Sequence, residues 1–311
     1  MSIFLKNLFA FVVLGGCLVS TFAGCALNAE NPTVSATTSG PIEKLEILYA
    51  VSEAFMETNK ANDSIFSLWN APQREDSPLK GKTIYWLGSS VTQGACANGQ
   101  SMAEYLSVMT GCICVNESLS GTTIYDDDSS DETGINSYTR RLVNSMKLDK
   151  NAKVDAFVCQ ISTNDAVASR RSHRGSMTDD SCHTSDAFDR STTLGGIEFI
   201  ITYVTETWGC PVYFYSGSYF GETGERSVPG LGSSYATLVE EVKQIVAKYQ
   251  VLGFDVGVID MYNDIAFNSM VSDEYFAWCM NDPVHPHAAG YLQWWTPYFE
   301  SYLAYEMMKK S

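Results

Sequence analysis

Five short apolar runs, separated by longer amphipathic stretches, constrain the fold of this chain more than any other feature. The runs are rich in valine, isoleucine, phenylalanine and tyrosine and are apolar at most positions, as in strands buried on both faces. They cover residues 83–87, 112–116, 154–160, 211–216 and 254–260. Helical periodicity predicts helices at residues 101–109, 137–147, 194–207, 234–249 and 287–309. This order predicts a single three-layer α/β domain in which helices cover both faces of a five-stranded parallel sheet.

The first 24 residues have the pattern of an export signal. Lys6 precedes an apolar run over residues 8–23, which is short for a membrane span and suits a signal peptide. The stretch "STFAGC" resembles the lipobox of bacterial lipoproteins, in which the cysteine, here Cys25, is lipidated and becomes the mature N-terminus. Cys17 is a competing match, but polar sequence begins directly after Cys25. We expect a signal peptide over residues 1–24 and a chain anchored on the extracytoplasmic side, with an uncleaved anchor as the alternative.

Residues 25–40 are small and polar without an apolar period, which predicts a flexible tether. A helical pattern begins at Pro41, with apolar residues at steps of three and four. Residues 41–311 are left for the domain, a length that one α/β domain can fill.

The chain is strongly acidic, with 20 Lys and Arg against 36 Asp and Glu. Removing residues 1–24, which hold one Lys and no acid, changes the balance to 19 minus 36, or −17. This charge argues against nucleic acid or an anionic membrane surface as a partner, since both require clustered cations. Seven cysteines follow Cys25, and their spacing is not that of a metal site. We expect most of them to be buried, and one or two disulfide bonds could form after export.

Polar residues with catalytic potential follow several of the predicted strands. Ser90 lies in "GSSVTQG" after the first strand, Gly121 in "NESLSGTT" after the second and Asn164 in "STND" after the third. Asp282 and His285 lie in "NDPVHPHAAGY", just before the last helix. Because ligands bind beyond the carboxyl ends of parallel strands, these residues are predicted to converge at one edge of the sheet.

This ordered set resembles the SGNH, or GDSL-type, hydrolase family, from about Gly81 to the C-terminal helix. Ser90 matches the nucleophile of the family's Gly-Asp-Ser-Leu block, and Gly121 matches its second-block glycine. Residues 162–165 match the Gly-x-Asn-Asp block, and residues 282–285 match the Asp-x-x-His block. The resemblance implies a flavodoxin-like SGNH hydrolase fold and ester hydrolysis without a metal or other cofactor.

Two positions depart from the family pattern. Ser89 replaces an aspartate that supports the nucleophile turn, and a serine can bond the local backbone in its place. Ser162 replaces a glycine, which could shift the strand end that aims Asn164. We expect these changes to affect the shape of the pocket and not the mechanism.

The residue types suit nucleophilic catalysis. A serine hydroxyl needs an adjacent base, which His285 supplies if Asp282 fixes its tautomer and stabilises the imidazolium. The N–H groups of Ser90 and Gly121 and the amide of Asn164 are candidate oxyanion-hole donors. His287 competes with His285 as the base, but it lies five residues from Asp282 and is predicted to open the last helix.

Other features bear on the class of enzyme and its substrate. An α/β-hydrolase is excluded because Thr92 stands where Gly-x-Ser-x-Gly requires glycine. Residues 166–193 form a long polar insertion that is predicted either to wall the pocket or to be a solvated loop. In the first case an arginine would contact an anionic or sugar hydroxyl group; the candidates are Arg170, Arg171 and Arg174. The aromatic residues of 291–295 could stack on sugars or pack into the core.

The combined hypothesis is an exported serine esterase that forms an acyl-enzyme on Ser90. Its expected partners are a small-molecule or glycan ester and the membrane that holds the lipid anchor, and O-acetyl groups on carbohydrate or cell-envelope material are the favoured substrate class. Lipase, thioesterase and acyltransferase activities stay open. The alternative from another class is a surface-binding lipoprotein on a degenerate SGNH scaffold without turnover.

Overall fold

The computed structural model describes residues 64–126, 133–179, 181 and 183–309. The predicted signal peptide, the tether and the helix that starts at Pro41 lie outside these residues and stay predictions. Within the described ranges, no helix combines the length and the apolar character needed to cross a bilayer.

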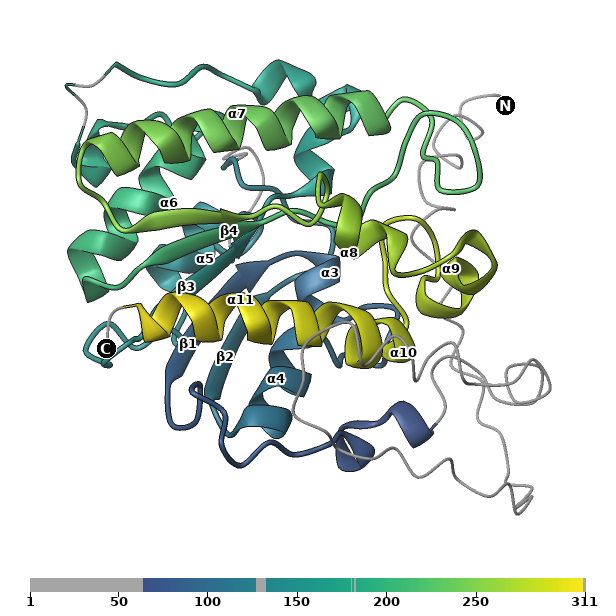
Figure 1. Ribbon diagram of the computed structural model, residues 1–311. Coiled ribbons are helices and arrows are strands. Elements are labelled where there is room, and N and C mark those ends of the chain that lie inside the picture. Colours follow the sequence, from purple (N-terminus) through teal and green to yellow (C-terminus); the bar gives the residue numbers. More distant parts are fainter. Residues whose placement is uncertain (1–63, 127–132, 180, 182, 310–311) are drawn as a thin grey trace, which may run out of the picture. The chain divides into compact units, whose positions relative to one another are not determined.

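The five predicted strands form one parallel sheet in the order β2-β1-β3-β4-β5, which confirms the predicted fold class (Figure 1). In the register of the central strands, Ile84 lies opposite both Cys114 and Ala156. The chain places β2 on one side of β1 and β3 on the other, so the carboxyl ends of these strands form the switch point where α/β proteins bind ligands. The bounds are β1 Thr83–Gly88, β2 Ile113–Ser118, β3 Ala156–Gln160, β4 Val212–Tyr215 and β5 Val256–Ile259.

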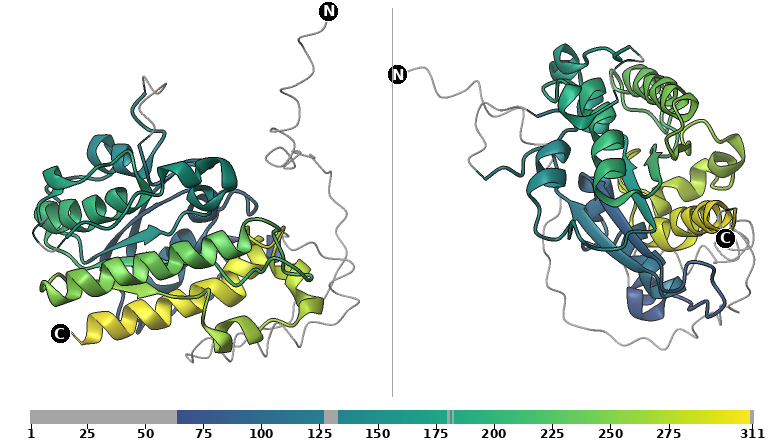
Figure 2. Two further views of the ribbon diagram at one scale, coloured as in Figure 1. Left: turned by 90° about the horizontal axis from the view of Figure 1, so that it is seen from above. Right: turned by 90° about the vertical axis from the view of Figure 1, so that its left-hand side faces the viewer.

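Helices cover both faces of the sheet (Figures 1 and 2). Side chains alternate along β1, so Ile84 and Trp86 pack on one face while Tyr85 and Leu87 pack on the other. All four are 2% exposed or less, which explains the continuous apolar run. The first face is covered by α4 (Met102–Thr110) and α11 (Thr296–Met308), and the second by α5 (Tyr138–Asn144), α6 (Thr193–Trp208) and α7 (Gly232–Val251).

Local sequence sets the ends of these helices. Ser101 and Glu104 form a capping box at the start of α4, and Gly111 ends that helix at a φ of +72°, in the left-handed region that favours glycine. Short helices occupy the connections: η1 Ser64–Phe66, η2 Leu68–Asn70, α3 Ser90–Gln93, η3 Thr163–Ala166, η4 Ala168–His173, η5 Ser185–Ala187, α8 Ile265–Ser269 and α9 Asp273–Cys279.

The last predicted helix is divided into three parts. It begins as α10 (Ala288–Gly290), widens into the π-helical turn η6 (Tyr291–Trp295) and continues as α11. Tyr291, Trp294 and Trp295 of η6 are at most 1% exposed, so this aromatic run packs into the core and is not a sugar-stacking surface.

The six described cysteines after Cys25 form no disulfide, and four of them are buried: Cys112, Cys159, Cys210 and Cys279.

Candidate active site

Ser90 is the first residue of α3 and lies directly beyond the carboxyl end of β1. The chain passes from strand to helix through Ser89 alone, which forces a close approach between Gly88 and Thr92. A Cβ at Gly88 would lie 1.7 Å from Thr92 Oγ1, so this position requires glycine. The turn leaves Ser90 5% exposed at the edge of the sheet.

Ser90, His285 and Asp282 form a continuous hydrogen-bonded chain. Ser90 Oγ lies 2.8 Å from His285 Nε2, and His285 Nδ1 lies 2.9 Å from both carboxylate oxygens of Asp282. A carboxylate can only accept, so we assign the proton to Nδ1, which leaves Nε2 to accept from the Ser90 hydroxyl. In this arrangement the histidine can take the proton of Ser90 as the oxygen attacks an acyl carbon.

A tight turn between α9 and α10 holds the acid beside the imidazole. Asp282 Oδ1 accepts the N–H groups of Val284 at 2.8 Å and His285 at 3.0 Å. The turn is closed by Asn281, whose N–H donates to the His285 carbonyl at 2.8 Å. Burial alone would raise the pKa of the Asp282 carboxyl, but the bond and charge of His285 and the two N–H groups together lower that pKa. Asp282 is therefore ionised at neutral pH.

The three candidate oxyanion donors come from the ends of three neighbouring strands. Gly121, after β2, has a φ of +81°, where a side chain would be strained. Asn164, in η3 after β3, donates from Nδ2 to the Thr122 carbonyl at 2.9 Å, which fixes its amide beside Gly121. The N–H groups of Ser90 and Gly121 donate to no acceptor among the described residues, as an oxyanion hole requires.

The serine at position 162, where the resembled motif has glycine, causes no visible distortion. Ser162 has φ −73° and ψ 123°, an extended conformation that any residue adopts. Asp165, three residues later, is fully buried and accepts the Ile124 N–H and the Thr193 hydroxyl, each at 2.9 Å. Burial raises the pKa of Asp165. These bonds tie the loop after β2 to the start of α6 and so brace the segment that carries Asn164.

Gln160, which the sequence analysis did not single out, supports the nucleophile turn. It is the last residue of β3, and its Oε1 accepts the Ser89 N–H at 2.9 Å and the Thr92 hydroxyl at 2.8 Å. The Ser89 hydroxyl also reaches this oxygen, at 3.3 Å, and makes no capping bond to the local backbone. The bond from the Ser89 hydroxyl to the local backbone that we expected is therefore not made, and this hydroxyl instead joins Gln160 of the neighbouring strand.

Only one of the three arginines proposed for the substrate lies next to the site. Arg171 donates to the Gly230 carbonyl and Arg174 pairs with Glu241 at 3.0 Å, so both fasten the insertion to other parts of the chain. Arg170 is half-buried, and its Nη1 lies 3.4 Å from the backbone oxygen of Asn164.

His287 is not the partner of Ser90. It precedes the first residue of α10, as predicted, and its Nδ1 lies 3.4 Å from the Cys96 carbonyl. Burial lowers its pKa. Among the residues that the structure describes, no group of three or more His, Cys, Asp or Glu side chains could hold a metal ion.

Comparisons with known proteins bear on the fold. No protein-family model and no curated protein sequence matches the chain. One solved structure aligns at a TM-score of 0.54 with 20% identity, over 74% of this chain and 98% of the other. A protein from Lactobacillus plantarum aligns at 0.52 with 21% identity, over 72% and 97%. These two proteins share the fold of this chain. A carbohydrate acetylesterase family member from Sinorhizobium meliloti aligns at 0.45 with 17% identity, over 73% and 99%.

Proposed function

We propose that this protein is an SGNH-type serine esterase, with Ser90 as nucleophile, His285 as general base and Asp282 as the residue that orients the histidine. The observation that carries the proposal is the unbroken chain from Ser90 Oγ to the Asp282 carboxylate at 2.8 and 2.9 Å. This chain of hydrogen bonds starts at the switch point of the sheet, where α/β proteins bind ligands. Such geometry disfavours the alternative of a degenerate, non-catalytic binding protein, because a scaffold without turnover has no need for it.

The proposed reaction has two halves. Ser90 Oγ attacks the carbonyl carbon of the ester while His285 Nε2 takes its proton, and the carbonyl oxygen gains charge beside the N–H groups of Ser90 and Gly121 and the amide of Asn164. The C–O bond of the ester then breaks, and His285 returns the proton to the leaving alcohol. A water molecule attacks the acyl-enzyme by the same route and releases the acid.

O-acetyl esters of carbohydrate or cell-envelope material are the proposed substrates, from the family resemblance and the predicted export. We expect an aryl acetate and an acetylated glycan to be hydrolysed faster than the same esters with acyl chains of eight or more carbons. Release of acid is measured across this series, and labelling by a fluorophosphonate reports whether Ser90 is reactive. Faster turnover of the long esters would contradict the acetyl preference. If the protein shows no hydrolysis and no labelling, the alternative of a binding protein is favoured.

Anchoring through Cys25 is proposed from the sequence. A Cys25→Ala variant expressed in a bacterial host is expected to leave the membrane fraction and to lack the mass of the lipid, because the acyl chains attach through this cysteine. Cell fractionation and intact-mass measurement check this, and Cys17→Ala is the matched control because Cys17 ends the competing match. A Cys25→Ala protein with unchanged partitioning and mass would refute this lipidation site.

A further inference from the structure

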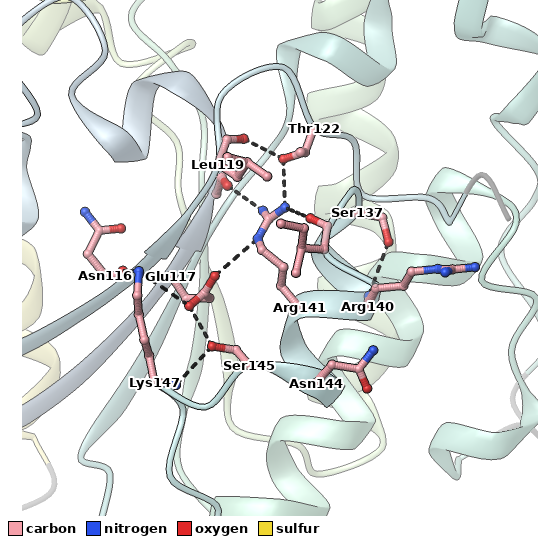
Figure 3. A network of polar contacts seen from close by, with 12 residues as sticks. Asn116, Glu117, Leu119, Thr122, Ser137, Arg140, Arg141, Asn144, Ser145 and Lys147 are labelled. Carbon is pink, nitrogen blue, oxygen red and sulfur yellow. Dashed lines mark hydrogen bonds and ion pairs between the residues drawn. The ribbon is translucent and has the colours of Figure 1, made fainter. Parts of the chain in front are cut away.

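A single buried cation joins the strand end that presents Ser90 to the loop that presents Gly121. Arg141 lies on α5 and is 1% exposed (Figure 3). Its guanidinium points from α5 toward Glu117 of β2 and toward Thr122 in the loop that follows β2. A buried arginine requires acceptors for its several N–H groups, so its partners show what it holds in place.

The first partner belongs to the nucleophile turn. Arg141 Nη2 donates at 2.7 Å to the carbonyl of Gly88, the last residue of β1 and two residues before Ser90. The N–H of Leu119, after β2, donates to the same carbonyl at 3.2 Å. Arg141 therefore strengthens the junction at which the chain leaves the sheet to present the nucleophile.

A second set of partners includes Thr122, in the loop after β2 that carries Gly121. Arg141 Nη1 donates to Thr122 Oγ1 at 3.0 Å and to the Ile135 carbonyl at 2.8 Å. Thr122 directly follows Gly121, and its own carbonyl accepts the Asn164 amide at 2.9 Å. Since glycine has no side chain to fix its place, the position of the Gly121 N–H depends on neighbours such as Thr122.

The charge of Arg141 is balanced inside the fold. Its Nε lies 3.6 Å from Glu117 Oε1, and Ser145 donates to the other oxygen of Glu117 at 2.6 Å. Burial lowers the pKa of Arg141, but an arginine stays protonated at neutral pH. A lysine would keep the charge but present a point donor that cannot reproduce the planar fork.

We propose that Arg141 is a positioning residue that holds the backbone donor of Gly121 and the amide of Asn164 in register with Ser90. This inference rests on the proposed esterase function. The oxyanion donors act only within about 2.7 to 3.1 Å of the developing charge, so a small shift of the loop weakens transition-state binding more than substrate binding.

The test compares Arg141→Lys with Arg140→Lys, its neighbour on the same helix. Arg140 pairs with Asp126 and makes none of the contacts to Gly88 or Thr122 that Arg141 makes, so it controls for a changed cation on α5. We expect Arg141→Lys to lower kcat on an aryl acetate by about 10- to 10²-fold, with KM changed less than about threefold. Each rate is divided by the concentration of active sites, which is measured by complete titration with a fluorophosphonate. A smaller fraction of folded protein therefore does not lower the value of kcat.

Two further readouts separate positioning from a general structural role. The affinity for a phenylboronic acid, which forms a tetrahedral adduct on serine, should fall by the same factor as kcat. Thr122→Val, which removes one acceptor of Arg141, should shift both quantities in the same direction if Arg141→Lys does not fold. If kcat per titrated site and boronate affinity stay within twofold of wild type in the variants that fold, the proposal is overturned.

Hydrogen–deuterium exchange tests the placement without turnover. Peptides spanning residues 85–94 and 119–124, which leave out the Arg140 partner Asp126, should exchange faster in Arg141→Lys and at the wild-type rate in Arg140→Lys. If the wild type neither hydrolyses esters nor takes the label, the esterase function fails, and the exchange data still decide the positioning. Unchanged exchange in Arg141→Lys would overturn the positioning alone.

Discussion

Replacing Ser90 with alanine is expected to lower kcat for ester hydrolysis by about 10⁴- to 10⁶-fold, the range found when serine hydrolases lose their nucleophile. The Ser90 oxygen is the atom that would form the acyl bond, and it lies 2.8 Å from Nε2 of His285, the proposed base. Without it, only the oxyanion donors and substrate binding can accelerate hydrolysis. The measurement is kcat on an aryl acetate, with a thermal melt to show that the variant is folded.

Ser89→Ala is the matched control, because it removes the same hydroxyl one residue earlier. Ser89 is fully buried and bonds Gln160 at 3.3 Å, so its loss removes about 1 kcal/mol of support and is expected to lower kcat by less than about tenfold. A fluorophosphonate should label the wild type and Ser89→Ala but not Ser90→Ala. Turnover by Ser90→Ala within about tenfold of wild type would refute the mechanism.

The strands could be predicted because a parallel strand is buried on both faces, as Trp86 and Leu87 of β1 are. The ends of the strands were harder to predict. The predicted run at 154–160 begins before β3, which starts at Ala156. Asp155, just before the strand, uses its carboxylate to accept the Thr83 N–H at 2.9 Å. The π-helical turn η6 could not be predicted. An extra residue in a helical turn rotates the following residues, and in a segment that is apolar on every side this rotation leaves no trace in the periodicity.

The proposed catalytic residues were predictable because each follows a strand or precedes the last helix in a recognisable motif. Gln160 and Arg141 were missed because their main partners, Ser89 and Gly88, lie 71 and 53 residues away. One signal was present for Arg141: it lies three residues after the buried Tyr138, a spacing that places both on the same face of α5. A cation on the apolar face of a helix indicates a buried network, but the identity of its partners required the fold.

Asp282→Asn is expected to lower kcat by about 10⁴-fold while leaving the turn folded. The amide oxygen can still accept the N–H groups of Val284 and His285, as Oδ1 does now. The amide nitrogen, however, would face His285 Nδ1 as a second donor, which favours the tautomer with the proton on Nε2 and blocks acceptance from Ser90. The lost negative charge also leaves the imidazolium without its partner.

The kinetic measurement uses the same aryl acetate, and Asp273→Asn, at an exposed acid on α9, controls for the change in charge. Near-normal kcat in Asp282→Asn would show that His285 does not depend on this acid.

The same variant links the site to stability through pH. Because the pKa of Asp282 is lowered in the folded protein, its carboxylate contributes stability that is fully present well above the unfolded pKa of about 4 and is lost as the pH falls through the folded value. Asparagine has no such dependence. We therefore expect Asp282→Asn to be less stable than wild type at pH 7, and the difference in free energy of unfolding to shrink towards pH 3. Urea denaturation of both proteins across this range measures the difference. A gap that stays constant with pH would mean that the carboxylate is not held by His285 and the two backbone N–H groups in solution, and the orienting role of Asp282 would then lose its physical basis.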